Sequence, residues 1–238
     1  MIAAVGRFDT GVLVDAVRAM ALNANAAYGH EYRVRGDSLR HDCGWGAALL
    51  GDGGFSVHRS TAPCFEDAGL NAIAGSRTDL AILHARRTPE RETIALRNTH
   101  PFAAAWRGTD YVFCHNGAVN DRSQLTWDPS LTGRASIDSE ELFFHVLTRL
   151  DEDAEAESVV ESLAAVEDFT ALNCFLASSS SLLTHTRMSP DIECPRYYTM
   201  WRGRGDGFEV VSSEIVDGFD VEWSAVPQGS AFRIPRDH

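Results

Sequence analysis

Residues 114–117, Cys-His-Asn-Gly, are the most specific candidate for chemistry in the sequence. They end a β-rich run that begins at residue 110. An amide side chain and a glycine N–H delivered to one point can stabilise a developing negative charge, as in an oxyanion hole. Asn-Gly is also the commonest pair in a type I′ turn. The motif therefore predicts either an oxyanion hole, made by the Asn116 side chain and the Gly117 N–H, or a simple turn.

Two charged residues are candidates for binding the ends of an amino acid. Arg86 lies in "HARRT" (84–88), at the end of a short β-rich run, where an arginine can hold a carboxylate bidentately or can simply face solvent. Asp138 begins "DSEE" (138–141) at the expected start of a helix. Its carboxylate could cap that helix or accept a substrate ammonium.

Two further motifs indicate special backbone positions. "CGWG" (43–46) places two glycines around a tryptophan, which suggests a close approach of backbone segments. "NTHPF" (98–102) begins a loop that contains a proline. Each motif is a weak signal when taken alone.

The remaining pattern predicts the elements that must position these residues. We expect a helix over 11–23 capped by Asp9 or Thr10, a hairpin over 45–60 turning at 51–54, strands over 80–86 and 110–117, and helices over 138–150 and roughly 157–166. The C-terminal third predicts strands at "ALNCFLAS", "SLLTHTR", "RYYTMW", "FEVVSS" and "AFRI". Strands, then helices, then strands favour a layered α+β domain over an alternating βαβ fold.

Composition excludes several classes of function. The 238 residues carry a net charge of −13, which argues against a nucleic-acid or anionic-membrane partner. The chain has no lysine, so Schiff-base, Ser–Lys and P-loop lysine chemistries are excluded. Five cysteines without a CxxC pair indicate free thiols, and no signal peptide or run of ~20 apolar residues is evident, so we expect a soluble cytoplasmic protein. No HExxH motif occurs, and we expect neither a metal nor a cofactor.

The order GWG, HxR, NTHPF, HNG and DSE resembles the class II glutamine amidotransferases, closest to the small stand-alone branch typified by the YafJ and EgtC proteins. "VVSSE" (210–214) and "VPQG" (226–229) extend the resemblance more loosely toward the C-terminus. The resemblance covers nearly the whole chain, so it implies a single glutamine amidotransferase type 2-like domain over residues 1–238.

The resemblance implies a fold, a reaction and a set of roles. The fold is the four-layer αββα sandwich of the N-terminal-nucleophile hydrolases, with two antiparallel sheets between helical layers. The reaction is hydrolysis of the side-chain amide of glutamine, or of a γ-glutamyl compound, through a cysteinyl thioester. The resemblance implies that Arg86 binds the substrate α-carboxylate and that Asp138 binds its α-ammonium. It implies that Asn116 and Gly117 form the oxyanion hole. The residues implied to support these loops are His84, Asn98 and His100.

The sequence departs from this family at the nucleophile. Family members begin Met-Cys, and removal of Met exposes a cysteine whose thiol attacks the substrate while its α-amine serves as base. Aligning "MIAAVG" with Gly6 in register places Ile2 in the cysteine position, and residues 1–9 hold no Ser, Thr or Cys. Two smaller departures are Cys43, where the family has Asp, and the spacing at Thr88 and Pro89.

Three hypotheses remain open. The protein could bind a glutamine-like or γ-glutamyl ligand, or a protein partner, without normal catalysis. It could be an active amidohydrolase that uses a replacement nucleophile such as Cys43 or Cys114. It could instead be a structural subunit with a vestigial pocket.

Overall fold

A computed structural model describes residues 1–37, 39–133 and 137–236, which form two antiparallel sheets. The seven-stranded sheet runs, in spatial order, β11 (Glu222–Ala225), β9 (Trp201–Gly205), β10 (Phe208–Ser212), β1 (Ile2–Gly6), β4 (Leu80–Ala85), β2 (Trp45–Gly51) and β3 (Gly54–Ser60). The five-stranded sheet runs β12 (Ser230–Pro235), β8 (Ser181–Thr186), β7 (Phe169–Ser178), β6 (Thr109–Val119) and β5 (Phe102–Trp106).

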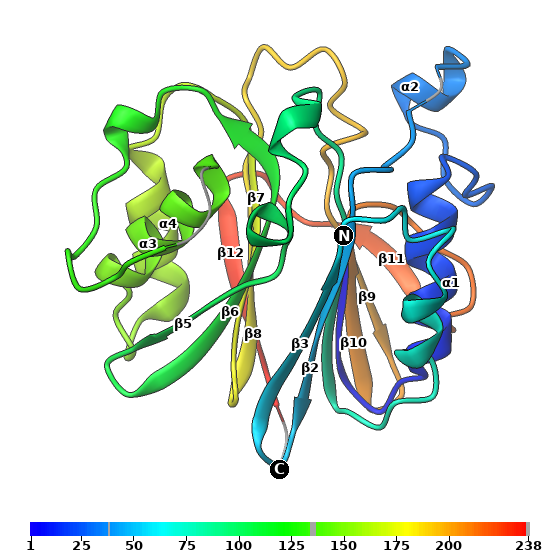
Figure 1. Cartoon of the computed structure of the whole chain (residues 1–238), viewed down its shortest axis with the longest axis horizontal. Helices are drawn as coiled ribbons and strands as arrows, with labels where there is room; N and C mark the ends of the chain where they lie inside the picture. The colour runs from blue at the N-terminus through cyan, green and yellow to red at the C-terminus, as the bar shows by residue number, and fades with distance from the viewer. Residues whose placement is uncertain (38, 134–136, 237–238) are drawn as a thin grey trace.

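The two sheets lie face to face between helices (Figure 1). Helix α1 (Thr10–Ala21) covers the outer face of the seven-stranded sheet, and α3 (Asp138–Arg149) and α4 (Glu155–Ala164) cover the outer face of the five-stranded sheet. The short elements are α2 (Glu31–Val34), η1 (Ala68–Ala72), η2 (Arg91–Thr93), η3 (Leu96–Asn98) and η4 (Arg122–Gln124). This arrangement confirms the predicted four-layer α+β sandwich.

Helix α1 begins where its sequence predicts. The Asp9 side chain accepts a hydrogen bond from the Gly11 N–H at 2.7 Å, so it satisfies one of the free donors of the first turn. Of the two predicted caps, Asp9 is therefore the one used. The apolar positions Leu13, Val14 and Val17 then share one buried face against the sheet.

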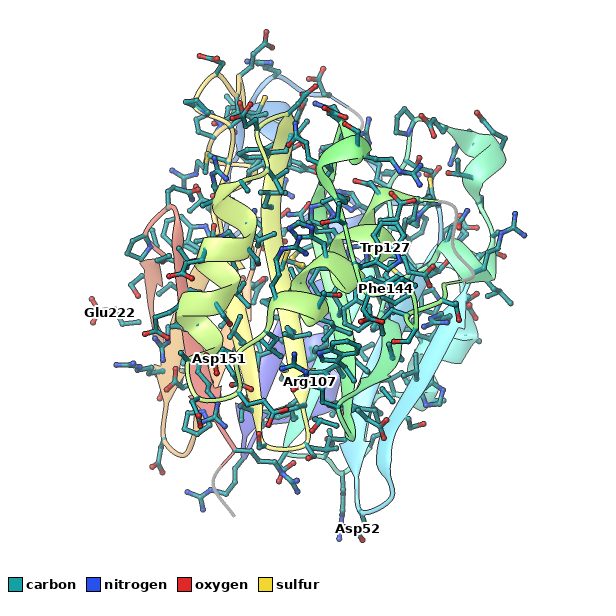
Figure 2. All side chains as sticks on the ribbon, turned by 90° about the vertical axis from the view of Figure 1, so that its left-hand side faces the viewer. Asp52, Arg107, Trp127, Phe144, Asp151 and Glu222 are labelled. Carbon is teal, nitrogen blue, oxygen red and sulfur yellow. The ribbon has the colours of Figure 1, made fainter. Side chains whose placement is uncertain are left out.

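Three apolar cores fill the spaces between the four layers. Alternation along β1 divides its side chains, with Ile2 and Ala4 in the core under α1 and Ala3 and Val5 in the core between the sheets. The third core lies between the five-stranded sheet and helices α3 and α4 (Figure 2). Each core also contains one cysteine: Cys64 under α1, Cys114 between the sheets and Cys174 under α3 and α4.

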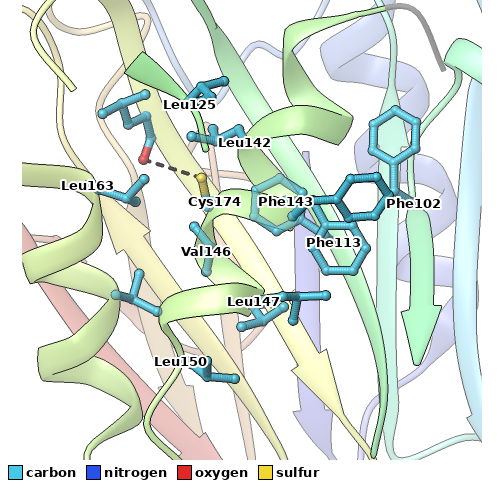
Figure 3. Packing of buried hydrophobic residues seen from close by; sticks show 14 of the residues in the cluster. Phe102, Phe113, Leu125, Leu142, Phe143, Val146, Leu147, Leu150, Leu163 and Cys174 are labelled. Atoms are coloured by element: carbon cyan, nitrogen blue, oxygen red, sulfur yellow. Dashed lines mark hydrogen bonds between the residues drawn. The ribbon is translucent and has the colours of Figure 1, made fainter. Parts of the chain in front are cut away.

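Aromatic stacking marks the centre of the core under α3. The rings of Phe113 on β6 and Phe143 on α3 are stacked with their centroids 5.1 Å apart (Figure 3). Toward solvent, Phe144 of the same helix packs against Trp127, as the side view shows (Figure 2). These contacts fix α3, and with it the position of its first residue, Asp138.

The structure corrects three predictions of secondary structure. "RYYTMW" is not a strand, because Tyr197 and Tyr198 lie in a turn with their rings packed against each other and against the cavity described below; β9 starts only at Trp201. The run 110–117 does not end at Gly117, because β6 continues to Val119. Strands β5 and β11 were not predicted: both are short edge strands, β5 has three consecutive alanines in its sequence, and β11 exposes three of its four residues.

Among the described residues, no helix has the length and apolar character that a bilayer crossing requires.

Candidate functional site

A cavity of about 640 Å³ opens where the ends of β4 and β6 meet the start of α3. Six of the seven predicted site residues line it: His84, Arg86, His100, Asn116, Gly117 and Asp138. A small extension of about 20 Å³ lies beside Met1 and shares His84 and Asn116 with the main cavity. A separate hollow of about 400 Å³ beside Phe8 and Phe219 contains none of the predicted residues.

Arg86 is held by backbone and side-chain contacts but keeps one donor free. Its backbone N–H donates to Gly44 O at 2.8 Å, and its carbonyl accepts from the Cys43 N–H at 3.0 Å. Nη2 donates to Thr93 Oγ1 at 2.9 Å, whereas Nη1 is buried and has no hydrogen-bond partner among the described residues. Burial lowers the pKa of this guanidinium from its ordinary value, and the negative charge of Asp138 is among the groups that oppose this shift.

The glycines of "CGWG" make this arrangement possible. A Cβ on Gly46 would lie 2.0 Å from the His100 carbonyl oxygen, and one on Gly44 would lie 2.6 Å from the Ser60 carbonyl oxygen. Gly44 also has φ = +113°, a conformation that favours glycine. The predicted close backbone approach is therefore confirmed, and it brings the His100 loop against β2.

Asp138 does not cap its own helix. Ile137 occupies the N-cap position and Asp138 is the first helical residue, so the predicted cap is wrong. Instead its Oδ2 accepts a hydrogen bond from the Val119 N–H at 2.7 Å, which turns the carboxylate toward the end of β6 and the cavity. The positive end of the α3 dipole favours a charged carboxylate at this position.

Asn116 and Gly117 lie inside β6 rather than at a turn. They pair with Asn173 and Leu172 of β7, and the pairing becomes irregular only between Gly117 and Val119. The alternative of a type I′ turn is therefore wrong. Gly117 has φ = +147°, and a Cβ there would lie 1.9 Å from the Ala171 carbonyl oxygen, so glycine is required by both conformation and space.

His84 and His100 form a buried pair of rings on the cavity wall. Their ring centroids are 4.3 Å apart, and their side chains are 7 % and 4 % exposed. Burial, reinforced by neighbouring positive charge, places the pKa of each ring well below its ordinary value, so both are neutral at pH 7. Neither nitrogen of His100 has a partner among the described residues, nor does Nδ1 of His84.

Asn98 stands behind this wall and does not line the cavity. Its Nδ2 donates to the Thr93 carbonyl at 2.8 Å, and Thr93 is the residue whose hydroxyl binds Arg86. The contact links Asn98 to Arg86 through a single residue, Thr93.

Comparisons with known proteins show the family and the fold of the chain. A family model of the class-II glutamine amidotransferases matches residues 19–189. The chain belongs to this family. The matched span starts after β1, so it includes Arg86, Asn116 and Asp138 but not the first residues.

Solved structures show the same fold at low identity. A predicted glutamine amidotransferase from Pseudomonas aeruginosa has 14 % identity and a TM-score of 0.60, with coverage of 98 % of this chain and 95 % of that one. A glutamine aminotransferase class-II domain protein from Silicibacter pomeroyi has 20 % identity and a TM-score of 0.57, with 82 % of this chain and 92 % of that one covered. Glutamine phosphoribosylpyrophosphate amidotransferase from B. subtilis has 13 % identity and a TM-score of 0.60, with 99 % and 49 % covered, so this chain spans about half of it. The comparison with curated proteins found no match.

Of residues 1–9, Met1 alone borders the cavity or its small extension. The Ile2 side chain is fully buried in the core under α1 and is absent from the cavity lining. Met1 borders the small extension, and its amino group donates to Ser213 Oγ at 2.9 Å. Burial lowers the pKa of that amino group to about 6.

Several cavity residues escaped the sequence analysis. His115 was quoted only as part of its motif, yet its ring contacts Ser139 Oγ at 3.0 Å and Ala171 O at 2.9 Å, and so ties β6 to α3 and β7. Local propensity predicts a strand at Tyr197, whereas in the structure it lies in a turn that lines the cavity. The signal in the sequence that could have indicated a cavity-lining turn here is the pair of adjacent tyrosines, Tyr197 and Tyr198, in a segment of mixed polarity.

Within the described ranges, no group of three or more His, Cys, Asp or Glu side chains is arranged to hold a metal ion.

Proposed function

We propose that this member of the class-II glutamine amidotransferases binds a glutamine-like or γ-glutamyl ligand in the 640 Å³ cavity and does not turn it over at the rate of an ordinary glutaminase. One observation carries the binding half of the proposal. Arg86 keeps a buried, unpartnered Nη1 donor in the same cavity that Asp138 lines. Buried donors without partners are rare in folded proteins, and a ligand carboxylate would satisfy this one.

The charges of the cavity match the two ends of an amino acid. Arg86 would bind the α-carboxylate, and Asp138 would bind the α-ammonium. Beyond them, the side chain of Asn116 makes no hydrogen bond within the described part of the chain, so it is available to the carbonyl oxygen of the ligand side chain. The Gly117 N–H would be the second donor to that oxygen.

The expected lack of ordinary glutaminase activity follows from the side chains at the start of the chain. The thioether of Met1 and the alkyl side chain of Ile2 cannot attack a carbonyl, so neither side chain can replace the cysteine thiol. Removing a nucleophile commonly lowers kcat by on the order of 10⁶. Oxyanion donors alone would leave a rate too small for ordinary metabolism.

The geometry does not favour a replacement nucleophile among the two cysteines considered. Cys114 is fully buried in the core between the sheets, and burial raises its pKa far above the ordinary value of a thiol. Cys43 is also buried, lies outside the cavity lining and contacts Arg91 and Asp42. A thiol must be ionised and accessible to attack.

Two measurements test the proposal together. Calorimetric titration with glutamine and with γ-glutamylethylamide should show binding, while an assay of ammonia release from glutamine should stay near the background rate. Turnover that disappears in Cys43→Ala or Cys114→Ala would favour the replacement-nucleophile hypothesis instead. A folded protein that binds neither compound would favour a structural subunit, for which a protein partner at the cavity mouth would be sought.

A further inference from the structure

The cavity is larger than a glutamyl group needs. Its volume of about 640 Å³ lies in the range of about 300–1,000 Å³ that holds drug-sized ligands, whereas glutamine is much smaller. The residues assigned above to the glutamyl group, here called the glutamyl site, are Arg86, Asn116, Gly117 and Asp138. Other parts of the lining have no role in that assignment, so the cavity has space for a group attached to the glutamyl amide.

His41, Tyr197 and Tyr198 form one wall of the cavity, here called the tyrosine wall. Tyr197 Oη contacts His41 Nε2 at 3.0 Å, and His41 Nδ1 contacts the Ala85 carbonyl oxygen at 3.1 Å, so the wall is joined to the end of β4. His41 and Tyr197 also line the small extension, which they share with Asn116. The tyrosine wall therefore lies on the side of the expected oxyanion hole, at the amide end of a glutamyl ligand.

The tyrosine wall is held in place by contacts behind it. The Glu31 carboxylate accepts hydrogen bonds from the N–H groups of Arg196 and Tyr197 at 2.8 Å and 3.1 Å. The Tyr197 ring packs edge-on against the rings of Tyr32 and Tyr198, with centroids 5.1 Å and 4.9 Å apart. The wall is thus ordered by its own contacts, which reduces the entropy that binding must supply.

Arg87 projects to the side of the tyrosine wall. The backbone pairing of β4 continues one residue past Ala85, because the N–H and the carbonyl of Arg86 both hydrogen-bond the 43–44 segment. Successive side chains of an extended strand point to opposite sides, so Arg87 shares the side of Ala85, which lines both the cavity and its extension. Arg87 itself lines the main cavity. Burial raises the pKa of the Tyr197 hydroxyl, and the positive charge of Arg87 is among the groups that oppose this shift.

The charge of Arg87 is not neutralised within the described part of the chain. Arg87 is exposed and makes no hydrogen bond or ion pair with the described residues, although the chain carries a net charge of −13. Arg122 also lines the cavity, but it is paired with Glu141. Outside the glutamyl site, the charged residues of the lining are these two arginines and Glu90, which leaves an excess of positive charge. An anionic group is the chemical complement of this region, and a carboxylate fits a guanidinium bidentately.

We infer that Arg87 and the tyrosine wall form a second subsite, which binds a carboxylate carried on the amide nitrogen of a γ-glutamyl compound. The inference rests on the proposed function and names its ligand class: a γ-glutamyl amino acid, in preference to free glutamine. Arg86 and Arg87 would bind the two carboxylates of one ligand from opposite sides of the strand. The tyrosine rings would cover the carbon atoms between the amide and the second carboxylate.

Two ligands of nearly equal size test the inference. γ-Glutamylglycine carries a carboxylate where γ-glutamylethylamide carries a methyl group. Calorimetry at pH 7.5 should show that the wild-type protein binds γ-glutamylglycine at least about tenfold more tightly, as expected for a hydrogen bond between charged groups. Equal affinities for the two compounds in the wild-type protein overturn the second subsite.

Variants assign the preference to a residue. Arg87→Met keeps a long side chain without the charge, so it should bring the ratio of the two affinities close to one and leave the Kd for γ-glutamylethylamide nearly unchanged. Arg77→Met is the matched control, because Arg77 is also exposed and unpartnered among the described residues but lies outside the cavity; it should keep the wild-type ratio. A preference that survives in Arg87→Met overturns the role of Arg87, and its loss in Arg122→Met would then assign the carboxylate to Arg122.

The second subsite and the glutamyl site can fail separately. If both compounds bind with the expected dependence on Arg86 but with equal affinity, the second subsite alone is overturned. Failure of the wild-type protein to bind either compound overturns the proposed function as well.

Discussion

Arg86 illustrates how a single residue can be prepared for a ligand. Its backbone is bound on both sides by the 43–44 segment, and one guanidinium nitrogen is bound by Thr93. The side chain is thus ordered before any ligand arrives, while Nη1 remains unpaired. Pre-ordering reduces the entropy that binding must supply, so the contact can contribute more to affinity.

Replacing Arg86 should therefore weaken ligand binding strongly. Truncating one partner of a desolvated charge pair typically costs about 2–5 kcal/mol, so Arg86→Ala should raise the Kd for glutamine roughly thirty-fold or more by calorimetry. Arg77→Ala is the control, because Arg77 is exposed and lies before β4, at the end of the strand away from the cavity. Arg122 is unsuitable, since it lines the cavity and pairs with Glu141. An unchanged Kd in Arg86→Ala would place the ligand elsewhere.

Asp138 should be tested with a ligand that lacks the ammonium. The wild-type protein should bind glutamine more tightly than glutaramic acid, which has the same carboxylate and amide but no amino group. Asp138→Asn keeps the shape and removes the charge, so it should reduce this preference about tenfold, as expected for a hydrogen bond between charged groups. Equal preference in the variant and the wild type would remove Asp138 from the ammonium site.

At the scale of elements, β6 is the strand that aligns the site, and Gly117 is its most constrained residue. Gly117→Ala should lower the free energy of unfolding by at least about 2 kcal/mol, because the new methyl group meets the Ala171 carbonyl and the φ of +147° is strained for alanine. Urea denaturation checks this. Gly53→Ala, in the β2–β3 turn with no atom within 4 Å of the added methyl group, should change stability little. Similar values for both variants would contradict the assigned constraint.

Elements with strong periodicity were predictable from the sequence, and those shaped by tertiary contacts were not. The apolar stripe and cap signal of α1, and the apolar run that ends in the glycine-rich turn at 51–54, gave the correct helix and hairpin. The pair Tyr197 and Tyr198 has high strand propensity, but its rings pack on the cavity, which no local pattern reveals. Strand β11 lacks any pattern because three of its four residues are exposed.

The site was predictable as a set of residues but not in its hydrogen bonding. Motif order brought Arg86, Asn116 and Asp138 to one place, and the structure lines a single cavity with all three. Sequence could not show that Asp138 binds the Val119 N–H rather than its own helix, because that choice depends on where β6 ends. It also could not show that His84 Nδ1 is buried without a hydrogen-bond partner among the described residues, because that depends on tertiary packing.

For the whole molecule, buried neutral histidines make stability depend on pH. Burial lowers the pKa of His30 and of His185 to about 4, whereas an unfolded histidine titrates near 6.5. The unfolded chain therefore binds more protons between these values, and the free energy of unfolding falls as pH decreases from about 6.5 to about 4. Each such histidine contributes up to about 1.4 kcal/mol per pH unit. Glu214 acts in the opposite direction, because burial raises the pKa of its carboxyl group, but it is one group against two histidines.

His185→Gln should reduce the slope of the free energy of unfolding against pH. The reduction corresponds to nearly one proton fewer taken up on unfolding. His185 lies in β8, outside the cavity, so the variant reports on folding rather than ligand binding. Urea denaturation between pH 7.5 and 5 gives the slope for both proteins. Parallel curves would show that His185 is protonated equally in the folded and unfolded states.

Each of the three apolar cores contains one cysteine, whose reaction with a thiol reagent can report when that core opens. Cys64, Cys114 and Cys174 lie in three different cores, and all are buried free thiols. A thiol reagent can reach each one only when its layer opens, so the labelling rate at that position measures the opening of that layer. If the sandwich unfolds as a unit, the three rates coincide; if α3 and α4 detach first, Cys174 is labelled ahead of the others. The protein thus carries, without any engineering, a separate reporter for each interface that holds its layers together.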